Sequence, residues 1–306
     1  MDTFSTKLGK VWRTDCISFL ENRILESGGL DKCQKYDLIF ADPPFNLGKQ
    51  YPSGMDDALS ESDYKIWCET WMEKCIYALK PGGSLFIWTL PKWGAHHAGY
   101  LDWVEDVTFR NWIAVSFKTG YPIKGRLYPA HYALLYATKG EPKTFHPDRV
   151  PMEVCPDCFS ELHDYGGHKD ALNPNGMNLS DIWMDISPVR HSSRKHREAN
   201  ELPLKLVDRI VSMASDEGDL VFDPFGGTGT TYAVCEMLGR RWEGTEFGPL
   251  DDIASRLSNL SLDRKELDRI HSEKNCLFTP EVETERRKAG LWTVSPDDSS
   301  GVEQFF

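Results

Sequence analysis

The residues from Leu220 to Thr231 constrain the fold of this chain more than any other segment. An apolar stretch, Leu220–Phe222, runs into the sequence Asp-Pro-Phe-Gly-Gly-Thr-Gly, and a helical pattern begins at Thr230. Glycines let backbone amides approach a ligand closely, and the first turn of a helix offers free N–H groups and a positive dipole. This order of strand, glycine-rich turn and helix predicts an α/β fold that binds a ligand at the carboxyl end of a strand.

The turn also indicates the class of ligand. It lacks the Gly-Lys-Ser/Thr ending of a phosphate-binding loop, which disfavours a nucleoside triphosphate. About 20 residues after Asp223 the next predicted strand ends in Glu246, and a carboxylate at that offset can accept hydrogen bonds from ribose hydroxyls. We therefore predict an adenosine-type cofactor, with candidate contacts at Asp223, Phe225, Gly227, Gly229, Thr230 and Glu246.

A second motif follows an early strand. The run Asp37–Ala41 reads as a buried parallel strand, and it ends in Asp42-Pro43-Pro44-Phe45, where the prolines forbid its continuation. This segment suits transfer to an aromatic amine, whose nitrogen lone pair is delocalised into the ring. Asp42 and the Pro43 carbonyl can accept the two amine hydrogens, and Phe45 can stack on the ring. The alternative interpretation of this segment alone is a rigid proline turn.

The rest of the chain alternates strand and helix patterns, which predicts a doubly wound, Rossmann-like, mostly parallel sheet. Helices are predicted at 64–79, 202–214 and 230–238, and strands at 10–13, 84–89, 112–117, 132–137, 220–222 and 243–246. Between residues 140 and 200 the periodicity is lost. The predicted organisation is a catalytic half (1–140), an irregular insertion (141–199), a cofactor-binding half (200–262), and a charged helix with a mobile tail (263–306).

Together the two motifs resemble those of the DNA amino-methyltransferases, in the beta-class order with the catalytic motif first. The resemblance covers about residues 9–140 and 200–260, and it includes Arg13-Thr14-Asp15-Cys16 and Lys80-Pro81-Gly82-Gly83. Two positions depart from the family pattern. Phe45 stands where the family usually has Tyr, and Glu201-Leu202-Pro203 stands where the family often has Lys-Pro.

The resemblance implies a function. It implies S-adenosylmethionine as methyl donor, site-specific methylation of double-stranded DNA, and a target base flipped into a pocket at Asp42, Pro43, Pro44 and Phe45. It places Asp15 near the cofactor adenine and Glu246 at the ribose. It also implies target recognition by the insertion, and a homodimer. A restriction endonuclease as functional partner, a solitary regulatory role and a phage origin all stay open.

The resemblance favours N6 of adenine as the methylated atom, because N4-cytosine relatives often begin the catalytic motif with Ser where this chain has Asp42. N4-cytosine methylation by the same machinery is the alternative. An RNA or non-nucleic substrate and a DNA-binding protein with a vestigial catalytic site also stay open. Methylation of cytosine C5 is disfavoured, because it needs a nucleophilic thiol and no Pro-Cys motif occurs in a suitable context.

The net charge and the local distribution of charge give opposite indications about nucleic-acid binding. The net charge of −12 disfavours DNA binding, which depends on phosphate contacts. Basic residues nevertheless gather in the middle of the chain, and we predict DNA contacts from Lys118, Lys124, Arg126, Arg190, Arg194, Lys195 and Arg197. A solvated basic loop is the alternative interpretation of the segment around Arg194.

The cysteines fall into two groups. Cys155, Cys158, His163 and His168 have the spacing of a small zinc knuckle, so a structural zinc is one interpretation and an unmetallated hairpin is the other. The other six cysteines are scattered among predicted helices and strands, which indicates buried reduced thiols.

The chain carries no sign of a membrane or export signal. No apolar run approaches the roughly 18–20 residues that span a bilayer, and the first ten residues lack a signal-like apolar stretch. The sequence predicts a cytoplasmic protein without a membrane partner.

Overall fold

The computed structural model describes residues 2–48, 57–116, 124–125, 127, 129–154, 172–187 and 201–293. The chain divides into two compact units. The first comprises Met1–His146 and Asp181–Asp263, and the second comprises Pro147–Ser180 and Arg264–Phe306. The segment expected to form one insertion, residues 141–199, therefore contributes to both units.

The first unit is built on one large sheet. Among the described residues it has nine strands, in the order β1 (Thr3–Ser5), β2 (Gly9–Arg13), β11 (Arg241–Glu246), β10 (Leu220–Asp223), β3 (Tyr36–Ala41), β4 (Leu79–Thr89), β6 (His131–Thr138), β5 (Thr108–Ser116) and β9 (Ile182–Trp183). The five strands from β2 to β4 in this order are mutually parallel. Strand β6 runs antiparallel between β4 and β5.

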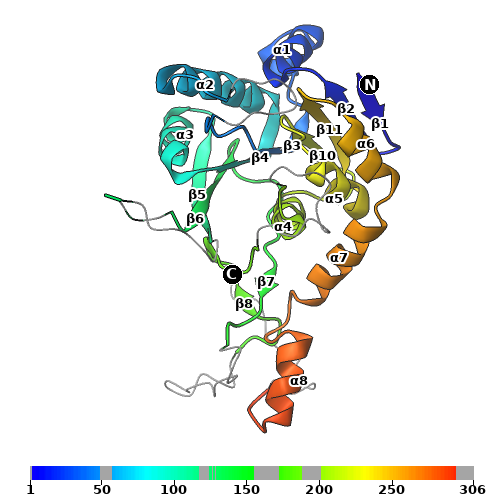
Figure 1. Ribbon diagram of the computed structural model, residues 1–306. Helices are drawn as coiled ribbons and strands as arrows, with labels where there is room; N and C mark the ends of the chain where they lie inside the picture. The colour runs from blue at the N-terminus through cyan, green and yellow to red at the C-terminus, as the bar shows by residue number, and fades with distance from the viewer. Residues whose placement is uncertain are drawn as a thin grey trace. The chain divides into compact units, whose positions relative to one another are not determined.

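Helices cover both faces of this sheet. One layer contains α1 (Cys16–Ser27), α2 (Glu61–Ala78) and α3 (Pro91–Trp103), and the other contains α4 (Leu204–Ala214), α5 (Thr230–Leu238) and α6 (Asp251–Ser258). Figure 1 shows the two layers on opposite sides of β3, β4 and β10. The predicted doubly wound, mostly parallel α/β fold is thus confirmed.

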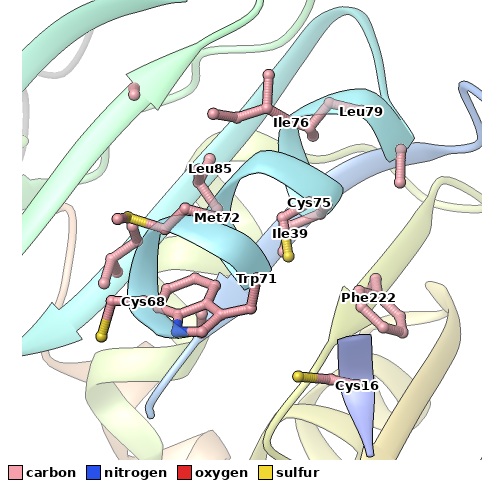
Figure 2. Packing of buried hydrophobic residues seen from close by; sticks show 14 of the residues in the cluster. Cys16, Ile39, Cys68, Trp71, Met72, Cys75, Ile76, Leu79, Leu85 and Phe222 are labelled. Carbon is pink, nitrogen blue, oxygen red and sulfur yellow. The ribbon is translucent and has the colours of Figure 1, made fainter. Parts of the chain in front are cut away.

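The central strands are buried beneath helix α2. Strand β3 is buried along its whole length, as its apolar sequence predicts. The buried side chains of this cluster include Trp71, Met72, Cys75 and Ile76 of α2, Ile39 of β3, Leu85 of β4 and Phe222 of β10 (Figure 2). Interiors of this kind are close-packed and low in compressibility, so the carboxyl ends of β3 and β10 sit on a rigid base.

The six cysteines outside the predicted zinc knuckle are free thiols. Cys16, Cys33, Cys68, Cys75 and Cys235 are buried, and Cys276 is partly buried. Burial raises the pKa of Cys68 to about 12, so this thiol stays protonated and unreactive near neutral pH. The prediction of buried reduced thiols is confirmed for five of the six.

The second unit is small. It contains a two-stranded sheet of β7 (Arg149–Val150) and β8 (Met177–Asn178), and helix α8 (Pro280–Lys288); α7 (Ser261–Ser272) crosses the boundary between the units. Buried Arg286 donates to the Trp292 carbonyl at 3.0 Å and lies over the Phe278 ring. None of the described helices is long and apolar enough to cross a membrane.

Two predictions fall on positions beyond this description. Cys155, Cys158, His163 and His168 lie outside the described residues, so the zinc site stays a prediction. The end of the predicted mobile tail, residues 294–306, also lies outside the described residues, so its mobility stays a prediction.

Candidate active site

Acidic residues meet at the carboxyl edge of the sheet. Strands β2, β11, β10 and β3 are neighbours and parallel, so their carboxyl ends lie at one edge. The acidic residues at or just after these strand ends are Asp15, Glu246, Asp223 and Asp42, respectively. Two come from the first half of the sequence and two from the last third. The structure therefore places the candidate catalytic motif beside the candidate cofactor motif.

The glycine-rich turn after β10 has the backbone geometry that its sequence predicts. Gly227 and Gly229 adopt positive φ angles of 53° and 76°. Residues with a side chain rarely adopt this left-handed backbone conformation. The turn is closed by a hydrogen bond of 2.7 Å from the Gly229 amide to the Gly226 carbonyl. Helix α5 begins at Thr230, with Gly229 as its N-cap. Because glycine has no side chain to cap the helix, the first amides of α5 stay available to a ligand.

Asp223 fixes the glycine-rich turn through two hydrogen bonds. It is fully buried, and its carboxylate accepts hydrogen bonds from the Thr231 hydroxyl at 2.5 Å and the Phe225 amide at 2.9 Å. Burial is the main cause that raises the pKa of Asp223, to about 7, and the charge of Glu246 adds to the rise. This carboxyl group therefore titrates near neutral pH, far above an ordinary aspartate.

Glu246 holds the other side of the turn. One carboxylate oxygen accepts from the Gly227 amide and the other from the Gly248 amide, both at 2.7 Å. Each oxygen has lone-pair capacity for a further donor, such as a ribose hydroxyl. Phe247 follows directly and is 46% exposed, so an apolar ring lies beside this carboxylate. No local sequence pattern marks Phe247 as a site residue.

Asp15 has a structural role as a helix cap, besides its predicted contact with the cofactor. It is the N-cap of α1, and its carboxylate accepts a hydrogen bond of 2.8 Å from the Ser18 amide. The neighbouring Thr14 amide donates to the Glu246 carbonyl at 3.0 Å. The loop after β2 is thereby fixed next to the loop after β11, while the predicted contact of Asp15 with adenine stays a prediction.

The backbone of the Asp-Pro-Pro-Phe segment is fixed by two aromatic donors. The Tyr64 hydroxyl of α2 donates to the Pro44 carbonyl, and the Trp93 indole of α3 donates to the Phe45 carbonyl, both at 2.7 Å. These contacts span 20 and 48 positions of sequence, so no local pattern could have revealed them. Because both carbonyls are engaged, the orientation of the loop after β3 is set from the helix layer.

Side-chain hydrogen bonds also fix the later part of the same loop, after Phe45. Asn46 has a positive φ of 53°, and its side chain exchanges two hydrogen bonds with the Leu59 backbone, at 2.8 and 2.9 Å. The Asp57 carboxylate accepts from the amides of Asn46 and Leu47 at 2.8 and 3.0 Å. An Asn after Phe45 is a recognisable signal for such a turn, because Asn tolerates positive φ.

Aromatic rings line the region beyond Asp42. The Phe45 ring lies 6.1 Å from that of Tyr132, which in turn stacks on Trp88 at 4.6 Å. Burial raises the pKa of Tyr132, and the nearby charge of Asp42 adds to the rise. Tyr132 thus lies within electrostatic reach of Asp42, a placement that its position at the start of β6 did not reveal. Phe225, which the sequence predicts as a cofactor contact, packs against Trp67 and Trp71 of α2.

Of the predicted DNA contacts, the structure describes only Lys124. Its side chain is exposed to solvent. Lys118, Arg126, Arg190, Arg194, Lys195 and Arg197 lie outside the described residues. Phosphate contact by this group stays a prediction.

Comparison with known proteins shows a family and several relatives to which this chain is similar. The family model N6_N4_Mtase, described as DNA methylase, matches residues 36–249. Type II methyltransferase M.BamHI of Bacillus amyloliquefaciens is 50% identical over 290 residues, which cover 94% of this chain and 66% of that protein. Type II methyltransferase M.HpaI of Haemophilus parainfluenzae is 31% identical over 212 residues, covering 69% of this chain and 63% of that protein. The matched regions thus span about two thirds of these relatives' own lengths.

Solved structures show the same fold. The M1.HpyAVI–SAM complex superposes with a TM-score of 0.54 at 18% identity, covering 81% of this chain and 98% of that one. The cytosine-N4-specific PvuII DNA methyltransferase superposes with a TM-score of 0.58 at 18% identity, covering 87% and 92%. At this identity the likeness concerns the fold alone. Since the family model matches more than half of its residues and a relative at 50% identity spans nearly all of it, the chain belongs to the N6/N4 DNA methylase family.

Proposed function

We propose that this chain is an S-adenosylmethionine-dependent DNA methyltransferase that methylates an exocyclic amino group of a base. The observation that carries the proposal is the placement of Asp42, Asp223 and Glu246 at one edge of the sheet, on neighbouring strands β3, β10 and β11. An acceptor for an amine thereby lies beside a turn suited to a nucleoside. Family membership supports the same activity.

The residues around the turn fit an adenosine-type cofactor. Glu246 has acceptor capacity for ribose hydroxyls, the half-exposed ring of Phe247 can stack on adenine, and the first amides of α5 face the turn. S-adenosylmethionine, when bound, supplies an electrophilic methyl group on a sulfonium. The carboxylates at this edge favour such a cation electrostatically.

Asp42 and its loop would act on the target amine. The Asp42 carboxylate and the Pro43 carbonyl accept the two amine hydrogens, which directs the nitrogen lone pair out of the base ring. The carbonyls of Pro44 and Phe45 are already engaged by Tyr64 and Trp93. The nitrogen would gain the methyl group as the donor's sulfur–methyl bond breaks and leaves a neutral thioether. The nitrogen would then lose one proton to Asp42 or to solvent. Phe45 would stack on the flipped base.

Tyr64→Phe is expected to lower kcat about three- to tenfold, the equivalent of one hydrogen bond, without changing the KM for S-adenosylmethionine. The change removes the hydroxyl that donates to the Pro44 carbonyl and that also contacts the Cys68 thiol. Steady-state kinetics on duplex DNA measures both constants. Tyr77→Phe is the matched control, since Tyr77 is also in α2 and its hydroxyl bonds Glu73 instead. Equal loss in the two variants would refute the positioning role.

Within this proposal, N6 of adenine is the methylated atom. The Asp at the head of the catalytic motif supports adenine, as does the relative named DNA adenine methyltransferase YhdJ of Escherichia coli, which is 27% identical over 220 residues. The test is to incubate the protein with labelled S-adenosylmethionine and mixed-sequence duplex DNA, digest the DNA to nucleosides and identify the labelled species. Label in N4-methylcytosine would keep the mechanism and overturn the base, and label in no DNA nucleoside would overturn the function.

The proposal extends to partners. Both relatives described above are named type II methyltransferases, which supports a restriction endonuclease of matching specificity as functional partner. DNA methylated by this protein would then resist that endonuclease, whereas the same DNA without the methyl group would be cut. The homodimer implied by the family resemblance is checked by sedimentation equilibrium of the purified chain.

A further inference from the structure

A buried arginine lies next to the glycine-rich turn. Arg256 belongs to α6 and is only 3% exposed. Its guanidinium pairs with Asp263 through two hydrogen bonds, of 2.7 and 3.2 Å, and with Glu201 through one of 3.0 Å. Burying charges is costly unless each is paired and hydrogen-bonded. A buried group of three charges in this position therefore calls for an explanation beyond packing.

The same guanidinium reaches the turn. Its Nη1 donates to the Thr230 hydroxyl at 2.8 Å, and it lies 3.4 Å from the Thr228 hydroxyl. Thr230 is the first residue of α5, and Thr228 lies inside the turn. Both threonines are almost fully buried. Arg256 thus connects two carboxylates to the two residues that flank Gly229.

Helix α6 touches the turn at a second point. A side chain at Gly229 would meet Ile253 of α6 at 3.2 Å, so the helix packs directly against the glycine backbone. The first half of the turn is held differently, by the hydrogen bond from Gly227 to Glu246. The turn is therefore fixed on one side by Glu246 and on the other by α6.

The chemistry of arginine suits this position. A planar guanidinium offers five donors in a fixed fork, so it can serve Asp263 along one edge and Glu201 and Thr230 at another. An ammonium carries a similar charge but lacks the fork. We propose that Arg256 is a positioning residue for methyl-donor binding, which sets the second half of the glycine-rich turn by linking Thr228 and Thr230 to Glu201 and Asp263. This inference rests on the proposed function.

The test is the affinity of the purified full chain for S-adenosylmethionine, measured by titration calorimetry. Arg256→Lys keeps the charge and is expected to weaken binding about tenfold, since the fork is lost. The KM for S-adenosylmethionine should rise similarly, whereas kcat at saturating cofactor should change less than about threefold. Arg269→Lys is the matched control, because Arg269 pairs with Glu266 and Glu273 on an exposed surface.

A double-mutant cycle separates positioning from general stability. Thr230→Val removes the accepting hydroxyl and keeps the branched shape. If Arg256 acts through Thr230, the double variant should bind no more than about twofold more weakly than Arg256→Lys alone. If Arg256→Lys does not fold, the threonine variants decide. Loss of affinity in Thr230→Val with recovery in Thr230→Ser supports the inference, and wild-type affinity in Thr230→Val overturns it.

The test distinguishes failure of the role proposed for Arg256 from failure of the proposed function. Wild-type protein that binds no S-adenosylmethionine would refute the proposed function. Wild-type protein that binds it, with unchanged affinity in Arg256→Lys despite a lower Tm, would leave the function standing and refute the positioning role. Fully additive losses in the cycle would refute it as well.

Discussion

Asp42→Ala is expected to lower kcat for DNA methylation by roughly 10²–10³-fold, the loss typical of removing one transition-state hydrogen-bond partner. The substitution removes the acceptor proposed for one amine hydrogen, and the alanine side chain cannot accept a hydrogen bond in its place. Affinity for S-adenosylmethionine should stay within about threefold of wild type, because the cofactor groups lie on other strands. Single-turnover methylation and titration calorimetry measure the two effects.

Asp102→Ala is the matched control for this substitution. Asp102 is exposed on α3, and its removal should leave both quantities unchanged. An Asp42→Ala variant that kept more than roughly a tenth of wild-type activity would show that Asp42 is not the principal acceptor. Loss of cofactor binding in the same variant would instead point to collapse of the sheet edge.

Asp223→Asn is expected to stabilise the folded protein above pH 7. In the unfolded chain this carboxyl titrates near 3.8, whereas in the folded protein its pKa is about 7. Between these values the folded state holds a proton that the unfolded state has released, so stability falls as pH rises from about 4 to about 7. Asparagine carries no such charge, and its Oδ1 can still accept from the Phe225 amide. Its NH₂ group would donate to the Thr231 hydroxyl, which in the wild-type protein donates to Asp223. The variant should therefore gain about 2–4 kcal/mol at pH 8 relative to wild type.

Urea unfolding at about pH 5 and about pH 8 measures this difference. The gain should be about 2–3 kcal/mol larger at the higher pH than at the lower one, because wild type loses further stability as pH rises to its folded-state pKa. Asp106→Asn, at an exposed position, controls for the general effect of removing one negative charge. A gain that does not grow between the two pH values would mean that Asp223 ionises at an ordinary pKa.

The sheet could be predicted because its strands carry strong local signals. Strands β3 and β10 are short apolar runs that stop at Pro or Gly, and both were found within one or two residues. Helix α3 was not predicted. Its buried positions include Gly94 and His97, which weaken the apolar pattern. Gly94 is explained by packing, because a side chain there would come within 2.8 Å of Trp112.

The candidate site likewise contains residues that the sequence predicts and residues that it does not. Asp42, Asp223 and Glu246 were predicted as site residues because each follows or ends a recognisable strand, and parallel strands bring such ends together. Tyr64, Trp93 and Arg256 were not predicted. Each acts through a contact with a distant segment, and such pairings depend on the packing of helices against the sheet. Local sequence patterns carry no information about them.

The order of strands in the sheet bears on how the protein is made. Strands β2 and β3 are synthesised early, yet in the finished sheet they are separated by β10 and β11, which are synthesised late. Until the ribosome has passed residue 246, the two early strands have a vacant place between them and one unpaired edge each. Exposed edges of this kind promote aggregation. We therefore expect the nascent chain to need chaperones, and fragments that end before Leu220 to be insoluble.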